Sequence, residues 1–148
     1  MVRNPTREGV VGPEHLLVVP DDTEIARVRS FVTDACSRAG AERDVAHRLE
    51  LAANEVCANV IEHGHPASPI EVSLIRHADE TRLTISDDGA AFDPRTIPPV
   101  DVAAGIERPA RGLGWHLVVH AVDVVEYERQ RGRNRLTLVV GDQAGAPR

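Results

Sequence analysis

Apolar residues that recur at steps of three and four positions predict two helices in the first half of the chain. The first helix follows capping oxygens in residues 21–23 and ends at Gly40. The second begins near Glu42 and continues through His63, where Gly64 provides a C-terminal stop. The first helix carries an apolar face and no candidate chemistry, so we expect it to be scaffold.

Alternation of apolar and polar residues predicts strands in the rest of the chain. They are expected at residues 15–19, 70–74, 81–86, 123–128 and 135–140. The second and third strands form an antiparallel hairpin, and the last two flank an arginine-rich turn at residues 130–134. We expect the arginines of that turn to be solvated.

A long loop is predicted at residues 95–111, which contain three prolines and show weak periodicity. In a small domain, a loop of this length is a lid or a disordered segment. A third helix follows, opened by Gly112 and Gly114 and continued by apolar residues through Val122. Free backbone N–H groups and the helix dipole at such an N-terminus favour a phosphate.

The composition limits the class of protein. A length of 148 residues suits one domain, and residues 1–13 and 142–148 are polar enough to be expected as flexible tails. A net charge of -6 without a basic block argues against direct nucleic-acid binding. All 17 basic residues are arginine, which excludes a phosphate loop of the G-K-[ST] type. With no membrane-spanning run and no signal pattern, we expect a cytoplasmic protein.

Glu55 and Asn59 lie four residues apart in the second helix, so their side chains project toward the same point. Two interpretations are open: a solvated stripe on an amphipathic helix, or a pair that serves one bound ligand. Asparagine is a mediocre helix former, and a glutamate is costly to bury within an apolar run. Packing alone therefore does not explain the pair.

The third predicted strand runs directly into Asp87-Asp88-Gly89, which indicates a tight turn with acidic groups at its mouth. Asp88 and Asp93 are expected to cap turns rather than to bind a ligand. Gly89 is compatible with an ordinary turn and also with a close approach of the backbone to a ligand.

Three short motifs occur in an order that one ATPase superfamily shows. They are the helix with Glu55, Asn59, His63 and Gly64, then Asp87-x-Gly89 followed by Phe92-Asp93-Pro94, then Gly112-x-Gly114 at a helix start. Over residues 14–140 the chain resembles the GHKL ATP-binding domain shared by gyrase, heat-shock protein 90, sensor histidine kinases and mismatch-repair ATPases. Within that superfamily it is most similar to free-standing bacterial anti-sigma factor serine/threonine kinases. Ala91 departs from the pattern, because many relatives have a second glycine there.

The resemblance implies an α/β fold, the Bergerat ATP-binding fold. This is a two-layer sandwich with a mixed, mostly antiparallel sheet of about five strands and helices on one face. It implies one domain over residues 14–141, in which residues 95–111 form a lid over the nucleotide. Relatives in this branch often pair, so a homodimer is compatible with the resemblance.

The resemblance also assigns roles to single residues. Glu55 is implied to be the general base, Asn59 to bind Mg²⁺ through its amide oxygen, and Asp87 to accept a hydrogen bond from the adenine amino group. Thr137 is implied to support the contact of Asp87 with adenine. The other residues implied to bind the nucleotide are Gly89, Gly112, Leu113 and Gly114.

The implied function is that of a partner switch with ATP and Mg²⁺ as cofactors. The protein would phosphorylate a serine on a small anti-sigma factor antagonist, and otherwise sequester a sigma factor. An alternative is a regulatory module that binds ATP and engages a partner without kinase activity. Both readings predict nucleotide binding, and they differ in the role of Glu55.

Overall fold

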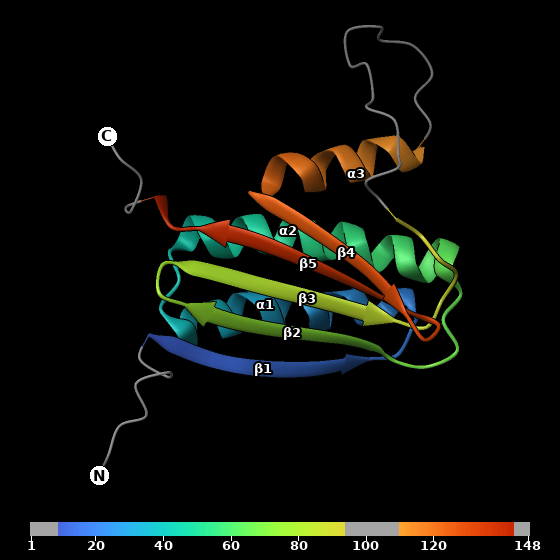
Figure 1. Ribbon diagram of the computed structural model, residues 1–148, viewed down its shortest axis with the longest axis horizontal. Coiled ribbons are helices and arrows are strands. Elements are labelled where there is room, and N and C mark those ends of the chain that lie inside the picture. The colour runs from blue at the N-terminus through green and yellow to red at the C-terminus, as the bar shows by residue number, and fades with distance from the viewer. Residues whose placement is uncertain (1–8, 94–109, 144–148) are drawn as a thin grey trace, which may run out of the picture.

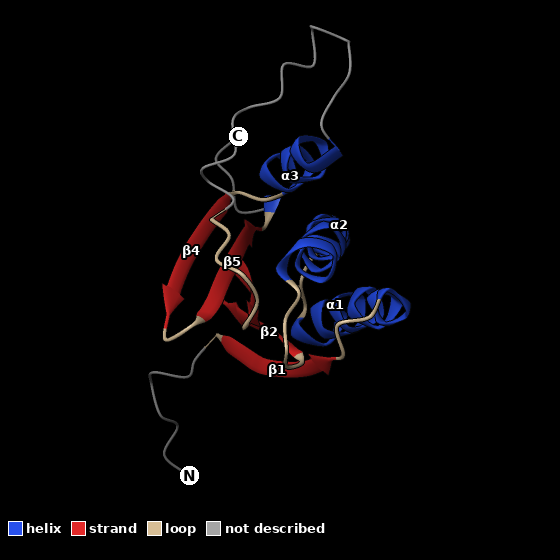
Figure 2. Cartoon of the chain, turned by 90° about the vertical axis from the view of Figure 1, so that its right-hand side faces the viewer, coloured by secondary structure: helices blue, strands red, loops and turns tan. Residues whose placement is uncertain are grey.

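The computed structural model of this chain describes residues 9–93 and 110–143. Five strands form one sheet in the order β1-β2-β3-β5-β4, and three helices cover one of its faces (Figures 1 and 2). The other face carries no helix in the described residues. This arrangement confirms the predicted two-layer α/β sandwich. Within these residues every strand pairing is antiparallel, so the described sheet is fully antiparallel and not mixed.

The elements follow the predicted order. The helices are α1 (Ile25–Ala39), α2 (Arg43–Asn59) and α3 (Ala110–Ala121), with a short 3-10 turn at Asp22–Glu24 and a π-helical turn at Val60–Gly64. The strands are β1 (Val10–Val18), β2 (Ile70–His77), β3 (Glu80–Asp87), β4 (Val124–Gln130) and β5 (Arg133–Gly141). No helix within the described ranges is long and apolar enough to cross a membrane.

The core lies between the sheet and the helices. Alternate residues of β2, β3 and β5 point to the helical layer, and Leu74, Leu83 and Leu138 are almost fully buried there. They meet the apolar stripes of the helices, represented by Val32 of α1 and Leu49 of α2. The two periodicities seen in the sequence therefore converge on one core.

β1 begins earlier than predicted, so residues 10–13 belong to the sheet and not to a flexible tail. The pairing of β1 with β2 changes register between Val11 and Glu14, and this bulge accommodates Pro13. Proline lacks an N–H donor, so an edge strand with a bulge is where a sheet tolerates it.

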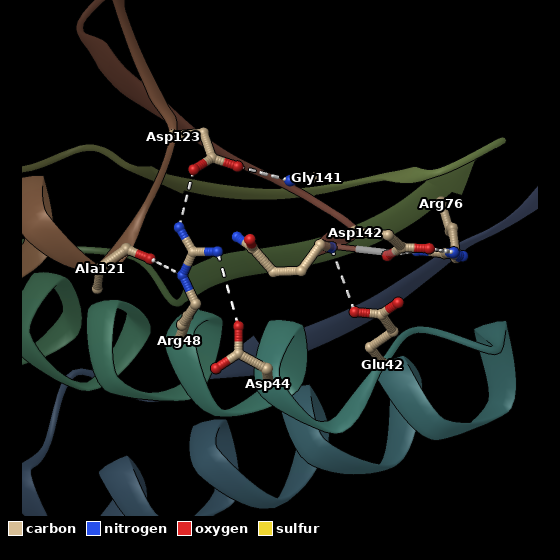
Figure 3. A network of polar contacts seen from close by, with 9 residues as sticks. Glu42, Asp44, Arg48, Arg76, Ala121, Asp123, Gly141 and Asp142 are labelled. Atoms are coloured by element: carbon tan, nitrogen blue, oxygen red, sulfur yellow. Dashed lines mark hydrogen bonds and ion pairs between the residues drawn. The ribbon is translucent and has the colours of Figure 1, made fainter. Parts of the chain in front are cut away.

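Polar contacts join the layers near the N-terminal end of α2 (Figure 3). Arg48 donates to the carbonyl oxygen of Ala121 at 2.7 Å and to the carboxylate of Asp123 at 2.8 Å. The second oxygen of Asp123 accepts the N–H of Gly141 at 2.7 Å. Arg48 thereby ties α2 to the end of α3 and to the start of β4.

A second ion pair holds the end of β5. Arg76 of β2 is only 8% exposed, pairs with Asp142 and donates to the hydroxyl of Thr81 at 3.0 Å. Its hydrogen bonds to Asp142 raise the pKa of the Arg76 guanidinium. The next residue, Gln143, donates its backbone N–H to Glu42 at 3.3 Å. Residues 142 and 143 are therefore part of the domain, whereas the rest of the predicted tail lies outside the described residues.

Substitution of Asp142 tests the contribution of its ion pair with Arg76 to stability. In Asp142→Ala the nearly buried guanidinium of Arg76 loses its ionic partner, so we expect the free energy of unfolding to fall by about 1–3 kcal/mol. Urea denaturation measures the change. The control is Glu24→Ala, which breaks an ion pair whose arginine side chain is 55% exposed, with an expected loss below about 0.5 kcal/mol. Equal losses in the two variants would contradict the assignment.

Candidate functional site

A cavity of about 220 Å³ opens at the C-terminal end of α2, between that helix, the end of β3 and the inner face of β4 and β5. Apolar walls are provided by Val56, Ile85, Trp115 and Leu136. The polar residues at its surface are Asn59, His63, Asp87, Tyr127 and Asn134. Apolar walls with a few convergent polar groups are typical of sites for small organic ligands.

The end of α2 changes from α-helical to π-helical geometry at Val60–Gly64. Such π-helical turns are rare and are frequently found at functional sites. Asn59 and His63 flank or occupy this turn, and both line the cavity. The C-terminal half of the helix motif predicted from the sequence thus lies at the cavity.

Asp87 ends β3 and is only 4% exposed. Its Oδ1 accepts the N–H of Gly89 at 2.8 Å and the side-chain amide of Asn134 at 3.2 Å. Oδ2 accepts no hydrogen bond from any described residue. Asp87 is one of the residues that line the cavity. A carboxylate oxygen in this position is suited to accept an N–H group of a ligand.

The turn after Asp87 packs against the end of α2. The N–H of Ala90 donates to the carbonyl oxygen of Gly64 at 2.9 Å. A Cβ at Gly89 would lie 2.6 Å from the same oxygen. Glycine is required here by contact between two backbones rather than by the predicted approach to a ligand.

Asp88 makes its hydrogen bonds to a different segment, residues 67 and 68. Its Oδ1 accepts the backbone N–H groups of Ala67 at 2.9 Å and Ser68 at 3.1 Å. Hydrogen bonds from the side chain of Ser68, then from its backbone, and from the backbone of Ala67 lower the pKa of the Asp88 carboxyl group. Asp88 thus caps a loop, as the sequence predicted.

Glu55 lies one helical turn before Asn59 and faces α3. A Cβ at Gly114 would be 2.6 Å from Oε2 of Glu55, so the small residue permits the carboxylate to approach α3. Glu55 is partly buried and is not among the residues that line the cavity. The structure therefore brings Asn59 and Asp87 to one cavity and places Glu55 beside it.

α3 begins at Ala110, so Gly112, Leu113 and Gly114 lie inside the first turns of this helix. The predicted loop at residues 95–111 is two residues too long at this end. The remainder of that predicted lid lies outside the described residues.

The structure contradicts the assignment of Thr137. It lies on the open face of the sheet, where its hydroxyl is 3.3 Å from that of Thr84. Alternation along β5 puts Asn134 and Leu136 on the cavity side and Thr137 on the other side. The residue that contacts Asp87 from β5 is Asn134.

Sequence reasoning missed Asn134 because the turn was placed at residues 130–134. The hairpin turn is in fact Arg131-Gly132, and β5 starts at Arg133. The missed signal was the alternation itself, since Asn134 is in phase with the apolar residues Leu136 and Leu138. A polar residue in phase with a buried stripe indicates a polar site.

Cys57 lies behind the site on the buried side of α2. Burial, and then the negative charge of Asp87, raise the pKa of its thiol to about 12. The thiol therefore stays protonated near neutral pH and is unreactive.

Comparisons with known proteins bear on this site. A family model described as a histidine kinase-like ATPase domain matches residues 18–140. The chain is 36% identical over 96 residues to serine/threonine-protein kinase BtrW of Bordetella bronchiseptica, and this alignment covers 61% of this chain and 66% of BtrW. It is 26% identical over 115 residues to serine-protein kinase RsbW of Bacillus thuringiensis, and this alignment covers 73% of this chain and 72% of RsbW.

Two solved structures are similar in fold. The RsbU and RsbW domains of Rv1364c from Mycobacterium tuberculosis align with a TM-score of 0.65 and 17% identity, covering 88% of this chain and 32% of that chain. A chain of the SiaB-SiaC complex from Pseudomonas aeruginosa aligns with a TM-score of 0.51 and 14% identity, covering 91% and 92%. At these identities the similarity concerns the fold alone.

The contact between α2 and the acidic turn is tested by two glycine substitutions. In Gly89→Ala the new Cβ meets backbone atoms of Gly64 at 2.6 and 2.9 Å, so we expect a loss of about 1–3 kcal/mol in the free energy of unfolding. In Gly64→Ala the nearest atom is 3.7 Å away, and we expect a change below about 1 kcal/mol. Denaturant unfolding compares the two. A Gly89→Ala variant as stable as Gly64→Ala would refute the close contact.

Proposed function

The chain belongs to the histidine kinase-like ATPase domain family, and we propose that it binds ATP in the cavity at the C-terminal end of α2. The observation that carries this proposal is the buried carboxylate of Asp87, which lines an otherwise largely apolar cavity with one oxygen that no described residue satisfies. An adenine base presents a flat apolar surface and one amino donor. The cavity offers a matching apolar wall and a matching acceptor.

Thr137 has no role in this proposal, because it lies on the open face of the sheet. The predicted residues near the cavity do have roles. Asp87 accepts the hydrogen bond of the adenine amino group. Asn59 contributes an amide oxygen to a Mg²⁺ ion that the phosphates also bind. No group of three potential metal ligands occurs in the described residues, so such an ion needs oxygens from the nucleotide and from water. Gly112 and Leu113 are among the first four residues of α3, whose backbone N–H groups have no partner within the helix and can bind the phosphates, and Gly114 follows them without a side chain.

The proposed reaction is phosphoryl transfer to a serine of a partner protein. The hydroxyl oxygen forms a bond to the terminal phosphorus of ATP, the bond from that phosphorus to the bridging oxygen breaks, and ADP leaves. Glu55 accepts the hydroxyl proton, because its carboxylate lies one turn from Asn59 and beside Gly114. The relatives named serine/threonine-protein kinase BtrW and serine-protein kinase RsbW support this reaction.

The biological role that we favour is a partner switch. The protein phosphorylates a small anti-sigma factor antagonist and otherwise sequesters a sigma factor. The names of the relatives support a protein kinase, and the fold similarity to the SiaB-SiaC complex is compatible with a domain that binds a partner protein. A second candidate is an ATP-binding regulatory module without kinase activity. It is favoured by the position of Glu55 outside the cavity lining.

Nucleotide binding is tested by calorimetric titration with ATP, with and without Mg²⁺. Loss of a charge-assisted hydrogen bond in Asp87→Ala should weaken binding about 10- to 100-fold. Asn59→Ala should abolish the effect of Mg²⁺. The control is Glu128→Ala, which removes an exposed carboxylate from the open face of the sheet and should leave the affinity within about twofold. Absence of ATP binding in the unmodified protein, with and without Mg²⁺, would refute the proposed function.

Kinase activity is tested by transfer of labelled phosphate from ATP to an antagonist protein encoded beside this chain. Glu55→Gln should lower the transfer rate at least about 100-fold while ATP affinity stays within about twofold, because a general base acts on the reaction and not on binding. Glu62→Gln, an exposed glutamate on the same helical segment, is the control. ATP binding without any transfer would favour the second candidate.

A further inference from the structure

Asn134 lies between the acidic turn and the outer strand of the sheet. In the antiparallel register it pairs with Asp87 of β3 on one side and with Arg129 of β4 on the other. Its side chain is 6% exposed and lines the cavity. In the strand order β3-β5-β4, the strand that carries Asn134 lies between the strands of Asp87 and Arg129 (Figure 1).

The amide nitrogen of Asn134 holds the acidic turn. It donates to Oδ1 of Asp87 at 3.2 Å and to the carbonyl oxygen of Ala90 at 2.9 Å, with a longer contact of 3.4 Å to the carbonyl oxygen of Gly89. The start of the turn and its end are therefore bound to one side chain. Movement of this amide would move the Asp87 carboxylate with it.

The amide oxygen of Asn134 is held from the other side. It accepts the hydroxyl of Tyr127 at 2.5 Å and the guanidinium of Arg129 at 2.9 Å. Rotation of the amide by half a turn would set its NH₂ group against these two donors, so they fix which end faces Asp87. Arg129 also donates to the carbonyl oxygen of Gly89 at 3.1 Å, which locks the turn and the amide together.

We propose that Asn134, oriented by Tyr127 and Arg129, is a positioning residue that aims the free oxygen of Asp87 and so sets the selectivity of the cavity for bases with an exocyclic amino group. This inference rests on the proposed ATP binding. Because Asn134 and Gly89 both engage Oδ1, the carboxylate is fixed at that oxygen and presents Oδ2 to the cavity. Asn134 acts through Asp87 and needs no contact with the base.

Selectivity follows from what each base can donate. A purine with a 6-amino group gains a charge-assisted hydrogen bond to Asp87, and this bond weakens steeply when the acceptor is misaligned. A purine without that group has no donor for the aimed oxygen. Loss of the orienting contacts should therefore weaken the first ligand and leave the second almost unchanged.

The experiment is a calorimetric cycle with ATP and with purine riboside triphosphate, which lacks the 6-amino group. Tyr127→Phe removes the hydroxyl that holds Asn134 and keeps the ring in the cavity wall. It should lower the ATP affinity about 3- to 10-fold and change the affinity for the analogue less than about twofold. The matched control is Thr84→Val, which removes one hydrogen-bonded hydroxyl from the open face of the sheet and should change neither affinity.

The outcomes separate this inference from the proposed function. If the unmodified protein binds ATP and prefers it to the analogue, while Tyr127→Phe leaves that preference intact, the positioning role is refuted and ATP binding stands. An equal loss for both nucleotides in Tyr127→Phe also refutes it, because the tyrosine then acts as a general wall of the cavity. If the unmodified protein binds neither nucleotide, both proposals fail.

A second variant guards against a folding defect in Tyr127→Phe. Arg129 is exposed, so Arg129→Met removes donors to Asn134 and Gly89 without opening a buried cavity. It should reproduce the selective loss for ATP of about 3- to 10-fold. Retention of the full preference for ATP in a folded Arg129→Met protein would overturn the inference independently.

Discussion

The site depends on a contact between two backbones. The carbonyl oxygen of Gly64, at the end of the π-helical turn, accepts the N–H of Ala90 at 2.9 Å. The two backbones are so close that position 89 has no room for a side chain. This contact joins the helical layer to the acidic turn of the sheet, and Asn59 and Asp87 face one cavity because of it. Burial of apolar residues can hold two layers together, but only a directional contact fixes the end of a helix against one turn.

Further polar contacts fix the strands and helices that surround this junction between α2 and the acidic turn. On the sheet side, Asn134 binds the acidic turn to β4. On the helical side, Arg48 binds the carbonyl oxygen of Ala121 (Figure 3). Gly114 lacks a side chain and so admits the carboxylate of Glu55 between α2 and α3. α3 is therefore positioned on α2 near both of its ends. The proposed phosphate-binding residues belong to the first turns of this helix, so a contact far from the cavity helps to place them.

The sequence indicated candidate site residues where chemistry and periodicity were independent signals. Glu55 and Asn59 stood out because packing does not select them, and Asp87 stood out because it ends a strand at a turn. Prediction failed for Thr137 and Asn134, since side chains in a strand alternate and a turn placed too late shifts the assignment to the wrong face. The first strand was predicted too short for a similar reason, because the bulge between β1 and β2 interrupts the alternation.

The environment of Asp87 links binding to stability. A nearly buried carboxylate is costly unless hydrogen bonds compensate its lost hydration. The donors on Oδ1 provide part of that compensation, and Oδ2 lacks a donor in the described part of the chain. A ligand that donates to Oδ2 satisfies the carboxylate in the folded state alone, so its binding also stabilises the junction between α2 and the acidic turn.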